Sequence, residues 1–515
     1  MPEEDYMVDL SDKIRQIREL VDGRCYFTIN RARQYGKTTL LAALERSFRE
    51  DYTVASISFE GLGDESFASA KELCSCFIKL VSEALSFRTA DGDYAKKWQN
   101  TNVTTFEQLS THITNMCKDR KVVLMVDEVD KASNNKVFLH FLSTLRHKFI
   151  ARKSGKDYSF HSVILAGVYD IKNIKLKLIQ EGSYTPTGGE GKIYNSPWNI
   201  AVSFDVDMSF HPTEIASMLV EYEGDHLTGM DISAVSNEIH RYTSGYPFLV
   251  SRICQCIDKE LSGDWTAGGV TKAVQIIVNK TNTLFDDAIK NLENNAELSD
   301  LIYDILILGE ERPYVEYDPT VGIGLRFGFL KKAENGEGVV MANKVFESVM
   351  TNYFVSKDLH RKKKSAGVLQ QDLLIGGRFD MERCLRKFAE HYNEIYNDFD
   401  AWFLERHGRL LFLSYLKPLI NGQGFYHIES QFTNLRRIDL VVDFGRQQFI
   451  VELKIWRGAQ YQAEAYEQLA EYLDYKNAEE GYLLTFDFRK RKKGNKEQTA
   501  KWLDTYGKRI FEVIV

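Results

Sequence analysis

The sequence predicts an α/β protein that has a doubly wound parallel sheet near its N-terminus, a largely helical middle and a second α/β domain at its end. Three observations predict this fold class. Fully apolar runs alternate with segments of helical period over the first 207 residues, as in a sheet buried on both faces. Helical patterns then prevail from residue 208 to about residue 310. From residue 386 onward the order becomes helix, strands, helix and strand.

Length, composition and charge exclude several classes of protein. A chain of 515 residues is too long for one hydrophobic core, so several domains are expected. The net charge of −7 means that any surface for nucleic acid must be local. No run approaches the roughly 18 apolar residues of a membrane span, so no membrane partner is expected. The seven scattered cysteines and the acidic start MPEEDYMVDL favour a reducing, cytoplasmic location.

The chain divides into five expected parts. These are a doubly wound domain at 1–207, a helical lid at 208–290, a winged-helix-like domain at 291–355, a linker at 356–385 and a C-terminal α/β domain at 386–515. The strands of the first domain are expected within the runs 25–29, 53–59, 121–131, 161–168 and 198–206. In the winged-helix-like part we expect a bend at Pro313 and a hairpin tip at 335–338.

The loop RARQYGKT at 31–38 ends as a phosphate-binding loop does, although Arg31 stands where the first glycine of G-x-x-x-x-G-K-[ST] belongs. Gly36 lets the backbone turn its amide groups toward phosphate at the start of a helix. Lys37 can reach the β- and γ-phosphates, and Thr38 can offer its hydroxyl to Mg²⁺. ATP is therefore the expected ligand. The other loop residues expected to contact it are Arg33, Gln34, Tyr35 and Thr39.

A second signature strengthens the first. In the run KVVLMVDEVDK at 121–131, the apolar stretch leads directly into the acids Asp127 and Glu128. Asp127 would hold magnesium, and Glu128 would polarise an attacking water. The alternative is a core strand followed by a solvated acidic turn. Pro247, in a Gly-Tyr-Pro break, either packs on adenine or simply starts a helix. No sensor or arginine-finger residue is assigned.

The C-terminal part raises its own question, because the apolar strand FIVELKIW carries Glu452 and Lys454 on one face. Folding the hairpin RIDLVV–DFGRQQ–FIVELK brings Asp439 beside them. Neighbouring carboxylates repel, and a divalent cation relieves the repulsion. Oxygen ligands suit Mg²⁺ or Mn²⁺, and a lysine beside the ion can orient the attacking water. The alternative is a ladder of salt bridges across two strands.

This D…E-x-K arrangement resembles the PD-(D/E)XK nuclease superfamily over the last ~130 residues. The resemblance implies further site residues: Glu405, on the preceding helix and four residues before Arg409, and Gln468 and Tyr472 of a Q-x-x-x-Y helix motif. One departure is that Arg437 and Ile438 stand where the motif has proline. Glu429 is a less favoured fourth acid.

The first part of the chain, about residues 5 to 280, resembles the prokaryotic AAA-like ATPases, which are P-loop NTPases often fused to such nucleases. The combination implies an ATP-regulated, Mg²⁺-dependent endonuclease that cuts DNA in preference to RNA and serves in defence or mobile-element biology. The alternative is an ATP switch whose last domain binds nucleic acid without cutting it. The basic run RKRKKGNK at 489–496 is either a backbone-binding segment or a solvated loop, and a homo-oligomer is compatible with the sequence.

Overall fold

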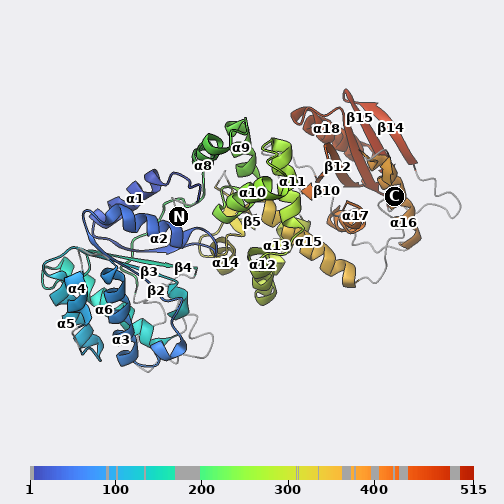
Figure 1. Ribbon diagram of the computed structural model, residues 1–515. Helices are drawn as coiled ribbons and strands as arrows, with labels where there is room; N and C mark the ends of the chain where they lie inside the picture. Colours follow the sequence, from blue (N-terminus) through green and yellow to red (C-terminus); the bar gives the residue numbers. More distant parts are fainter. Residues whose placement is uncertain are drawn as a thin grey trace, which may run out of the picture. The chain divides into compact units, whose positions relative to one another are not determined.

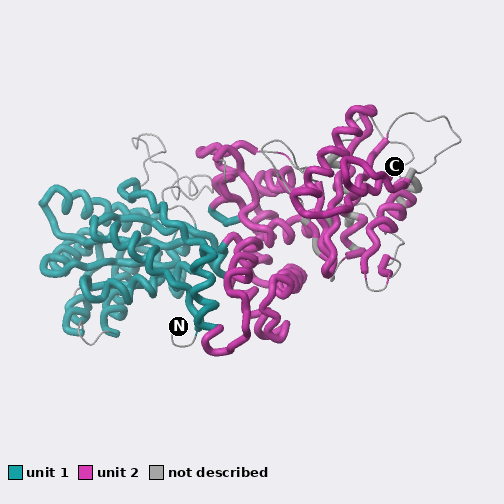
Figure 2. Tube along the Cα trace, turned by 90° about the horizontal axis from the view of Figure 1, so that it is seen from above, with its two compact units in different colours: residues 1–222, 245–248, 326–328 teal, residues 223–244, 249–325, 329–515 magenta. Residues whose placement is uncertain are grey.

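The fold is taken from a computed structural model, shown in Figure 1. The structure describes residues 5–87, 92–99, 102–132, 135–168, 198–308, 310, 312–333, 336–361, 373–375, 378–395, 405–420, 424–427, 439–487 and 499–515. The chain forms two compact units (Figure 2). The first comprises 1–222, 245–248 and 326–328, and the second comprises 223–244, 249–325 and 329–515. The five-part division of the chain stays a prediction.

The first unit contains the expected parallel sheet. Its strands are β1 (Tyr26–Asn30), β2 (Thr53–Ser58), β3 (Val122–Asp127) and β4 (Ser162–Gly167), in the order β1-β4-β3-β2. All neighbouring pairs are parallel. The run 198–206, expected to be a fifth strand, contributes only a bridge from Val202 to Phe27. At the end of this run, the carbonyl of Val206 accepts a hydrogen bond from the Arg31 guanidinium rather than from the main chain of a neighbouring strand.

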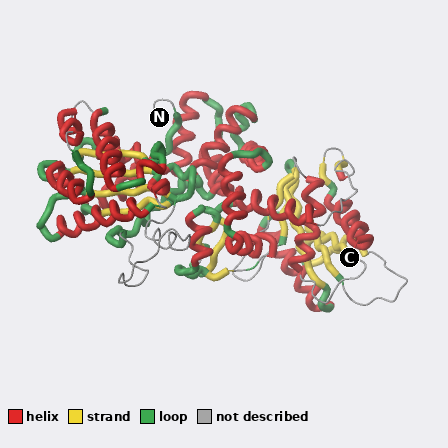
Figure 3. The backbone as a smooth tube through the Cα atoms, turned by 90° about the horizontal axis from the view of Figure 1, so that it is seen from below, coloured by secondary structure: helices red, strands yellow, loops and turns green. Residues whose placement is uncertain are grey.

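Helices cover both faces of this sheet (Figures 1 and 3). They are α1 (Ser11–Asp22), α2 (Lys37–Phe48), α3 (Ala70–Ser86), α4 (Gly92–Gln99), α5 (Phe106–Cys117) and α6 (Lys136–Lys153), followed by α8 (Pro212–His226). Alternate residues of β3 serve the two layers: Val123 and Met125 pack with α1 and α2, whereas Leu124 and Val126 pack with α3, α5 and α6. Burial on both faces explains why this strand is continuously apolar.

A buried ion pair stabilises the α5–α6 layer. Lys148 is completely buried, its Nζ lies 2.6 Å from Asp157 Oδ2, and it also donates to Thr114. We expect Asp157→Asn to lower the free energy of unfolding by about 3 kcal/mol, because it leaves a buried ammonium without its counter-charge. Urea or thermal unfolding measures the loss. Asp93→Asn, in an exposed pair with Lys96, is the control, and equal losses in the two variants would contradict this account.

The second unit begins with a helical region and a small antiparallel sheet. The elements are α9 (Ile232–Thr243), α10 (Pro247–Glu260, whose first two residues belong to the first unit), α11 (Ala267–Val278), α12 (Thr283–Asn294), α13 (Ala296–Tyr303), the π-helical turn η4 (Asp304–Leu308), β5 (Arg312–Pro313), α14 (Pro319–Arg326), β6 (Leu330–Lys332), β7 (Gly338–Met341) and α15 (Lys344–Arg361). The sheet order is β5-β7-β6. The expected hairpin is present as β6 and β7. The bend expected at Pro313 is instead a short strand, which proline tolerates because β5 lies at the sheet edge.

The C-terminal part of this unit is a six-stranded sheet with helices. Its elements are β8 (Leu374–Ile375), β9 (Arg378–Phe379), α16 (Met381–Ile395), α17 (Glu405–Ile420), β10 (Gly424–His427), β11 (Leu440–Phe444), β12 (Gln447–Ile455), α18 (Ala459–Tyr475), β13 (Glu480–Phe486), β14 (Thr499–Thr505) and β15 (Lys508–Ile514). The sheet order is β10-β11-β12-β13-β15-β14. From α17 to β13 the elements follow the expected order α-β-β-β-α-β. On α18, Leu469 and Leu473 pack in one core cluster with Ile450 and Leu483 of the sheet.

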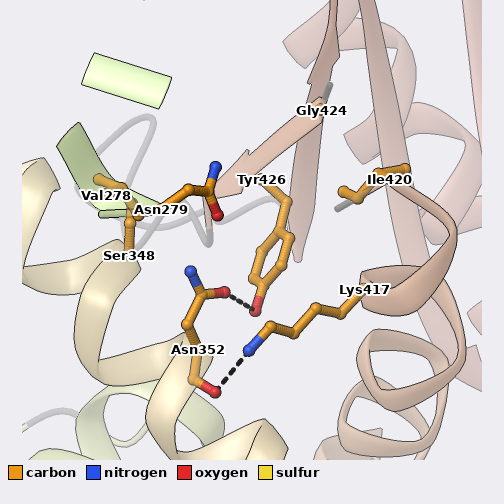
Figure 4. Close-up of a pocket in the computed structure, with 8 residues that line it drawn as sticks. All are labelled: Val278, Asn279, Ser348, Asn352, Lys417, Ile420, Gly424 and Tyr426. Atoms are coloured by element: carbon orange, nitrogen blue, oxygen red, sulfur yellow. Dashed lines mark hydrogen bonds between the residues drawn. The ribbon is translucent and has the colours of Figure 1, made fainter. Parts of the chain in front are cut away.

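Helix α17 also contacts the middle of the second unit. Lys417 Nζ donates to the carbonyl of Asn352 on α15 at 2.6 Å and to Ser356 Oγ at 2.9 Å. Tyr426 of β10 donates to Asn352 Oδ1 at 3.3 Å. Figure 4 shows Asn352, Lys417 and Tyr426 around a small pocket. In the described part of the chain, no helix is both long and apolar enough to cross a membrane.

The contact of Lys417 predicts a pH dependence. Burial lowers the pKa of Lys417 from 10.5 to about 8. Between these two values the unfolded chain keeps a proton that the folded chain has released, so this group makes the free energy of unfolding rise with pH. We expect Lys417→Met to lose that rise. Urea unfolding of both proteins at pH 8 and pH 10.5 measures it, and the same pH dependence in both would contradict the assignment.

Candidate nucleotide and nuclease sites

The phosphate-binding loop joins β1 to α2. Gly36 precedes the helix with a φ of +75°, a left-handed conformation that glycine adopts without strain. The first bond of the helix runs from Leu40 N to Gly36 O at 2.9 Å. The amides of residues 37–39 therefore have no acceptor within the helix and make an N-terminal anion site.

Lys37 lies beneath this loop. Its Nζ donates to the carbonyls of Arg31 at 3.1 Å and Ala32 at 2.9 Å, and the residue is 6% exposed. Burial lowers the pKa of Lys37, although the nearby acids Glu128, Asp130 and Asp127 oppose that shift. A cation held by neutral carbonyls is well placed to turn toward an incoming phosphate.

The two nucleotide signatures meet at the carboxyl end of β3. Thr38 Oγ1 donates to Asp127 Oδ2 at 2.6 Å, and Glu128 N donates to Asp127 Oδ1 at 2.9 Å. Glu128 has a φ of +53°, which is uncommon for a residue with a side chain and is typical of strained functional positions. Burial raises the pKa of Glu128, whereas Lys37 lowers it. The structure thus brings Thr38, Asp127 and Glu128 to one place.

The remaining loop residues are placed differently. Arg31 donates to the carbonyls of Asn30 and Val206, both at 3.0 Å, so its guanidinium is engaged by main chain at the edge of the sheet. Tyr35 is half-buried, and its ring meets Tyr246 edge-on with the ring centroids 4.6 Å apart. Three further predicted residues are exposed: Arg33, Gln34 and Thr39.

A segment distant in sequence lies against this loop. Tyr246 OH donates to the carbonyl of Arg33 at 2.5 Å. Pro247, the first residue of α10, has its Cβ 3.8 Å from the position that a Cβ on Gly36 would take. A Cβ placed on Gly328 would lie 3.1 Å from the Cβ of Ala32. Pro247 therefore both starts a helix and borders the loop. Sequence reasoning missed Tyr246, although it directly precedes Pro247.

In the C-terminal part, the structure brings together the three residues of the D…E-x-K pattern. Leu440 of β11 pairs with Val451 of β12, which sets Asp439 opposite Glu452. Asp439 N donates to Glu452 Oε2 at 3.3 Å, and Lys454 Nζ lies 2.7 Å from Glu452 Oε1.

A second cation, which the sequence did not reveal, completes the site. Burial raises the pKa of Glu452, and the neighbouring Asp439 raises it further, whereas Lys454 lowers it. Arg409 of α17 forms an ion pair with Asp439 Oδ1, and its other terminal nitrogen lies 3.5 Å from the carbonyl of Ile307. Sequence reasoning had placed Arg409 opposite Glu405. The side chain of Glu405 lies outside the described part, so that pairing stays a prediction; the described contacts of Arg409 are to Asp439 and Ile307.

The helix motif of the resemblance has two possible registers. Gln468 is half-buried and Tyr472 is fully buried on α18, where Tyr472 joins the core cluster. Gln462 and Tyr466 have the same Q-x-x-x-Y spacing six residues earlier. Gln462 Nε2 and Tyr466 OH both donate to Glu512 Oε1, at 2.6 and 2.7 Å. The repeated spacing was the signal that sequence reasoning overlooked.

Some predicted residues fall outside the description. Residue 405 begins α17, but its side chain lies outside the described part, as do Glu429 and the basic run 489–496. Within the described residues, no group of three or more histidine, cysteine, aspartate or glutamate side chains could hold a metal. Among the described residues, a divalent ion here would take its carboxylate ligands from Asp439 and Glu452. These carboxylates fit Mg²⁺ or Mn²⁺, which keep open positions for water and phosphate oxygen.

Comparisons with known proteins match both halves of the chain. The model of the AAA-like domain family matches residues 6–307, and that of the PD-(D/E)XK nuclease superfamily matches residues 425–498. An uncharacterized WD repeat-containing protein of Synechocystis is 24% identical over 395 residues, which cover 72% of this chain. The match spans only 31% of the length of that relative.

Among solved structures, the chain is similar to the ORC2 protein of Aeropyrum pernix, with 13% identity and a TM-score of 0.37 over 69% of this chain and 97% of that one. It is also similar to a RuvB mutant of Thermotoga maritima, with 12% identity and a TM-score of 0.32 over 65% and 92% of the two chains. Likenesses at these scores do not bear on function.

Proposed function

Because the chain belongs to the AAA-like domain family and carries a C-terminal PD-(D/E)XK nuclease domain, we propose that it is an ATP-controlled, metal-dependent endonuclease. Its substrate is nucleic acid, DNA in preference to RNA, and its role lies in prokaryotic defence or mobile-element biology. The observation that supports cleavage most strongly is the contact of Asp439, Glu452 and Lys454 at the ends of adjacent strands.

In this proposal each residue of the nuclease site has a separate task. Asp439 and Glu452 hold Mg²⁺ or Mn²⁺ through their carboxylate oxygens. A bound divalent ion activates water and offsets charge on the phosphate. Lys454, held beside Glu452, orients the attacking water and stabilises the negative charge that grows on the phosphate oxygens. Gln468 and Tyr472 support the helix behind the site, and Glu405 is assigned as a further acid because the superfamily resemblance implies it.

In the first unit, we assign ATP to the loop between β1 and α2. The amides of residues 37–39 and the ammonium of Lys37 bind its phosphates, and Thr38 and Asp127 hold the accompanying Mg²⁺. Glu128 polarises the attacking water, and Pro247 borders the nucleotide. The other residues assigned to nucleotide binding are Arg31, Arg33, Gln34, Tyr35, Gly36 and Thr39.

The ATP assignment predicts a split between binding and hydrolysis. Glu128→Gln keeps the shape of the side chain but removes the base, so we expect hydrolysis to fall by about 10²–10⁴-fold. ATP affinity should stay near the wild-type value. Phosphate release and binding of a fluorescent ATP analogue measure the two quantities. Unchanged hydrolysis in this variant would remove Glu128 from the proposed mechanism.

Cleavage itself is tested with supercoiled plasmid, Mg²⁺ and either ATP or a non-hydrolysable analogue. Asp439→Asn removes a metal-binding carboxylate without changing the side-chain shape, and we expect no nicking by this variant. Asp443→Asn, four residues further along the chain and within β11, is the matched control. Equal cleavage by wild type and Asp439→Asn would exclude the site.

One observation favours a second candidate function. The Arg409–Asp439 ion pair balances the charge of the nuclease site. A site neutralised in this way suits a protein that binds nucleic acid under ATP control without cutting it. That function predicts nucleic-acid binding together with inactivity toward every substrate and divalent metal.

A further inference from the structure

The nuclease site already contains a complete set of counter-charges. Asp439 Oδ1 pairs with Arg409, and Asp439 Oδ2 accepts the amide of Leu453 at 2.9 Å. Glu452 Oε2 accepts the amide of Asp439 at 3.3 Å, and Glu452 Oε1 faces Lys454. Three of the four carboxylate oxygens therefore accept hydrogen bonds, and the fourth, Glu452 Oε1, has among the described residues only the ammonium of Lys454 as an ionic neighbour, without a hydrogen bond.

When both carboxylates are ionised, as metal binding requires, the charges of these four side chains sum to zero. Two carboxylates face one guanidinium and one ammonium, and the Arg409 and Asp439 side chains are only 12% and 11% exposed. A divalent ion entering this set would raise the local charge to +2 in a poorly solvated place, which is unfavourable. Without the guanidinium, the same two carboxylates and Lys454 would carry a charge of −1 and would attract the ion. Among these four described side chains, Arg409 therefore decides whether the net charge is zero or negative.

Helix α17, which carries Arg409, also contacts the middle region of the second unit. The 3.5 Å approach of Arg409 to the carbonyl of Ile307 connects the site to η4. Eight residues further along α17, Lys417 donates to the carbonyl of Asn352 on α15 (Figure 4). Two long cationic side chains of one helix thus reach main-chain carbonyls of the middle region. These contacts fix the position of the guanidinium relative to Asp439.

We propose that Arg409 is an internal counter-ion that keeps divalent metal out of the nuclease site, and that metal loading requires its guanidinium to leave Asp439. The proposal rests on the proposed nuclease function and adds how that activity is restrained. It makes the docking of α17 on η4 and α15 the element through which the rest of the chain can release the site.

Metal binding, rather than cleavage, tests the proposal. Electron paramagnetic resonance of free Mn²⁺ gives the affinity of the full-length protein for this ion. Arg409→Gln is expected to bind Mn²⁺ about 5- to 150-fold more tightly than the wild type, the usual range for coupling between two competing equilibria. Arg386→Gln is the matched control, because Arg386 also pairs with a carboxylate, Glu382, and reaches a main-chain carbonyl. Its Mn²⁺ affinity should equal that of the wild type.

Three further variants separate the outcomes. Asp439→Asn should bind Mn²⁺ more weakly than the wild type, and combining it with Arg409→Gln should abolish the gain of Arg409→Gln. If the double variant binds Mn²⁺ as Arg409→Gln does, the proposed nuclease site itself is wrong. If Asp439→Asn weakens binding but Arg409→Gln gains none, the site stands and the counter-ion proposal is overturned. Arg409→Lys keeps a positive charge near Asp439 and controls for a folding defect, although lysine lacks the planar guanidinium, so its Mn²⁺ affinity should stay closer to that of the wild type than to that of Arg409→Gln. A gain equal to that of Arg409→Gln would show that charge is not the cause.

Discussion

Replacing Lys454 with alanine is expected to lower plasmid cleavage by about 10²–10³-fold while ATP hydrolysis continues at the wild-type rate. The ammonium of Lys454 lies 2.7 Å from Glu452 Oε1. Because the Lys454 side chain is only 14% exposed, a lysine or arginine on the protein surface cannot take over its position. Its loss removes the group that stabilises charge on the phosphate in the transition state.

The variant has a second consequence. Without Lys454, the fully buried Glu452 faces Asp439 with less positive charge nearby, which favours a protonated carboxyl group over a metal-binding carboxylate. Higher Mn²⁺ concentrations should therefore restore only part of the cleavage. Lys501→Ala, on the exposed side of β14, is the control and should cleave normally. Full activity of the Lys454 variant would rule out hydrolysis at this place.

Replacing Lys37 with alanine is expected to weaken ATP binding by about 2–5 kcal/mol, the usual loss when one partner of a buried charged contact is truncated. Lys37 is nearly buried and holds the loop through the carbonyls of Arg31 and Ala32. The variant therefore loses both a phosphate ligand and a support of the loop. Isothermal titration with ATP measures the effect.

The same variant tests control by nucleotide. If ATP governs cleavage, Lys37→Ala should give one rate of plasmid nicking with and without ATP, whereas the wild type gives two. Lys153→Ala, at the exposed end of α6, should behave as the wild type. A Lys37 variant that still responds to ATP would show that the nucleotide acts elsewhere or not at all.

Much of the fold could be predicted because short sequence patterns determine where its strands and helices lie. The apolar run before Asp127 became the central strand β3, and the alternation around Glu452 became β12. The hairpin register followed from a short turn that leaves few pairings between the two strands. Strands β14 and β15 were not predicted, although Tyr506 and Gly507, both with positive φ, form a tight turn between them.

The candidate sites were predicted less completely, because their remaining members come from distant parts of the chain. The local pattern around Arg409 indicated only a partner four residues away, whereas its contact with Asp439 depends on how α17 packs against the sheet. The approach of Tyr246 to the loop joins residues 213 positions apart in the chain. No periodicity encodes such contacts, since they arise only when the elements assemble.

The central claim is that Asp439 and Glu452 together bind a divalent ion, and anomalous diffraction tests it most directly. Crystals grown with saturating Mn²⁺ should show a manganese peak about 2.0–2.4 Å from an oxygen of each carboxylate, with the Arg409 guanidinium moved away from Asp439. A map without that peak, in which Arg409 still pairs with Asp439, would contradict the account.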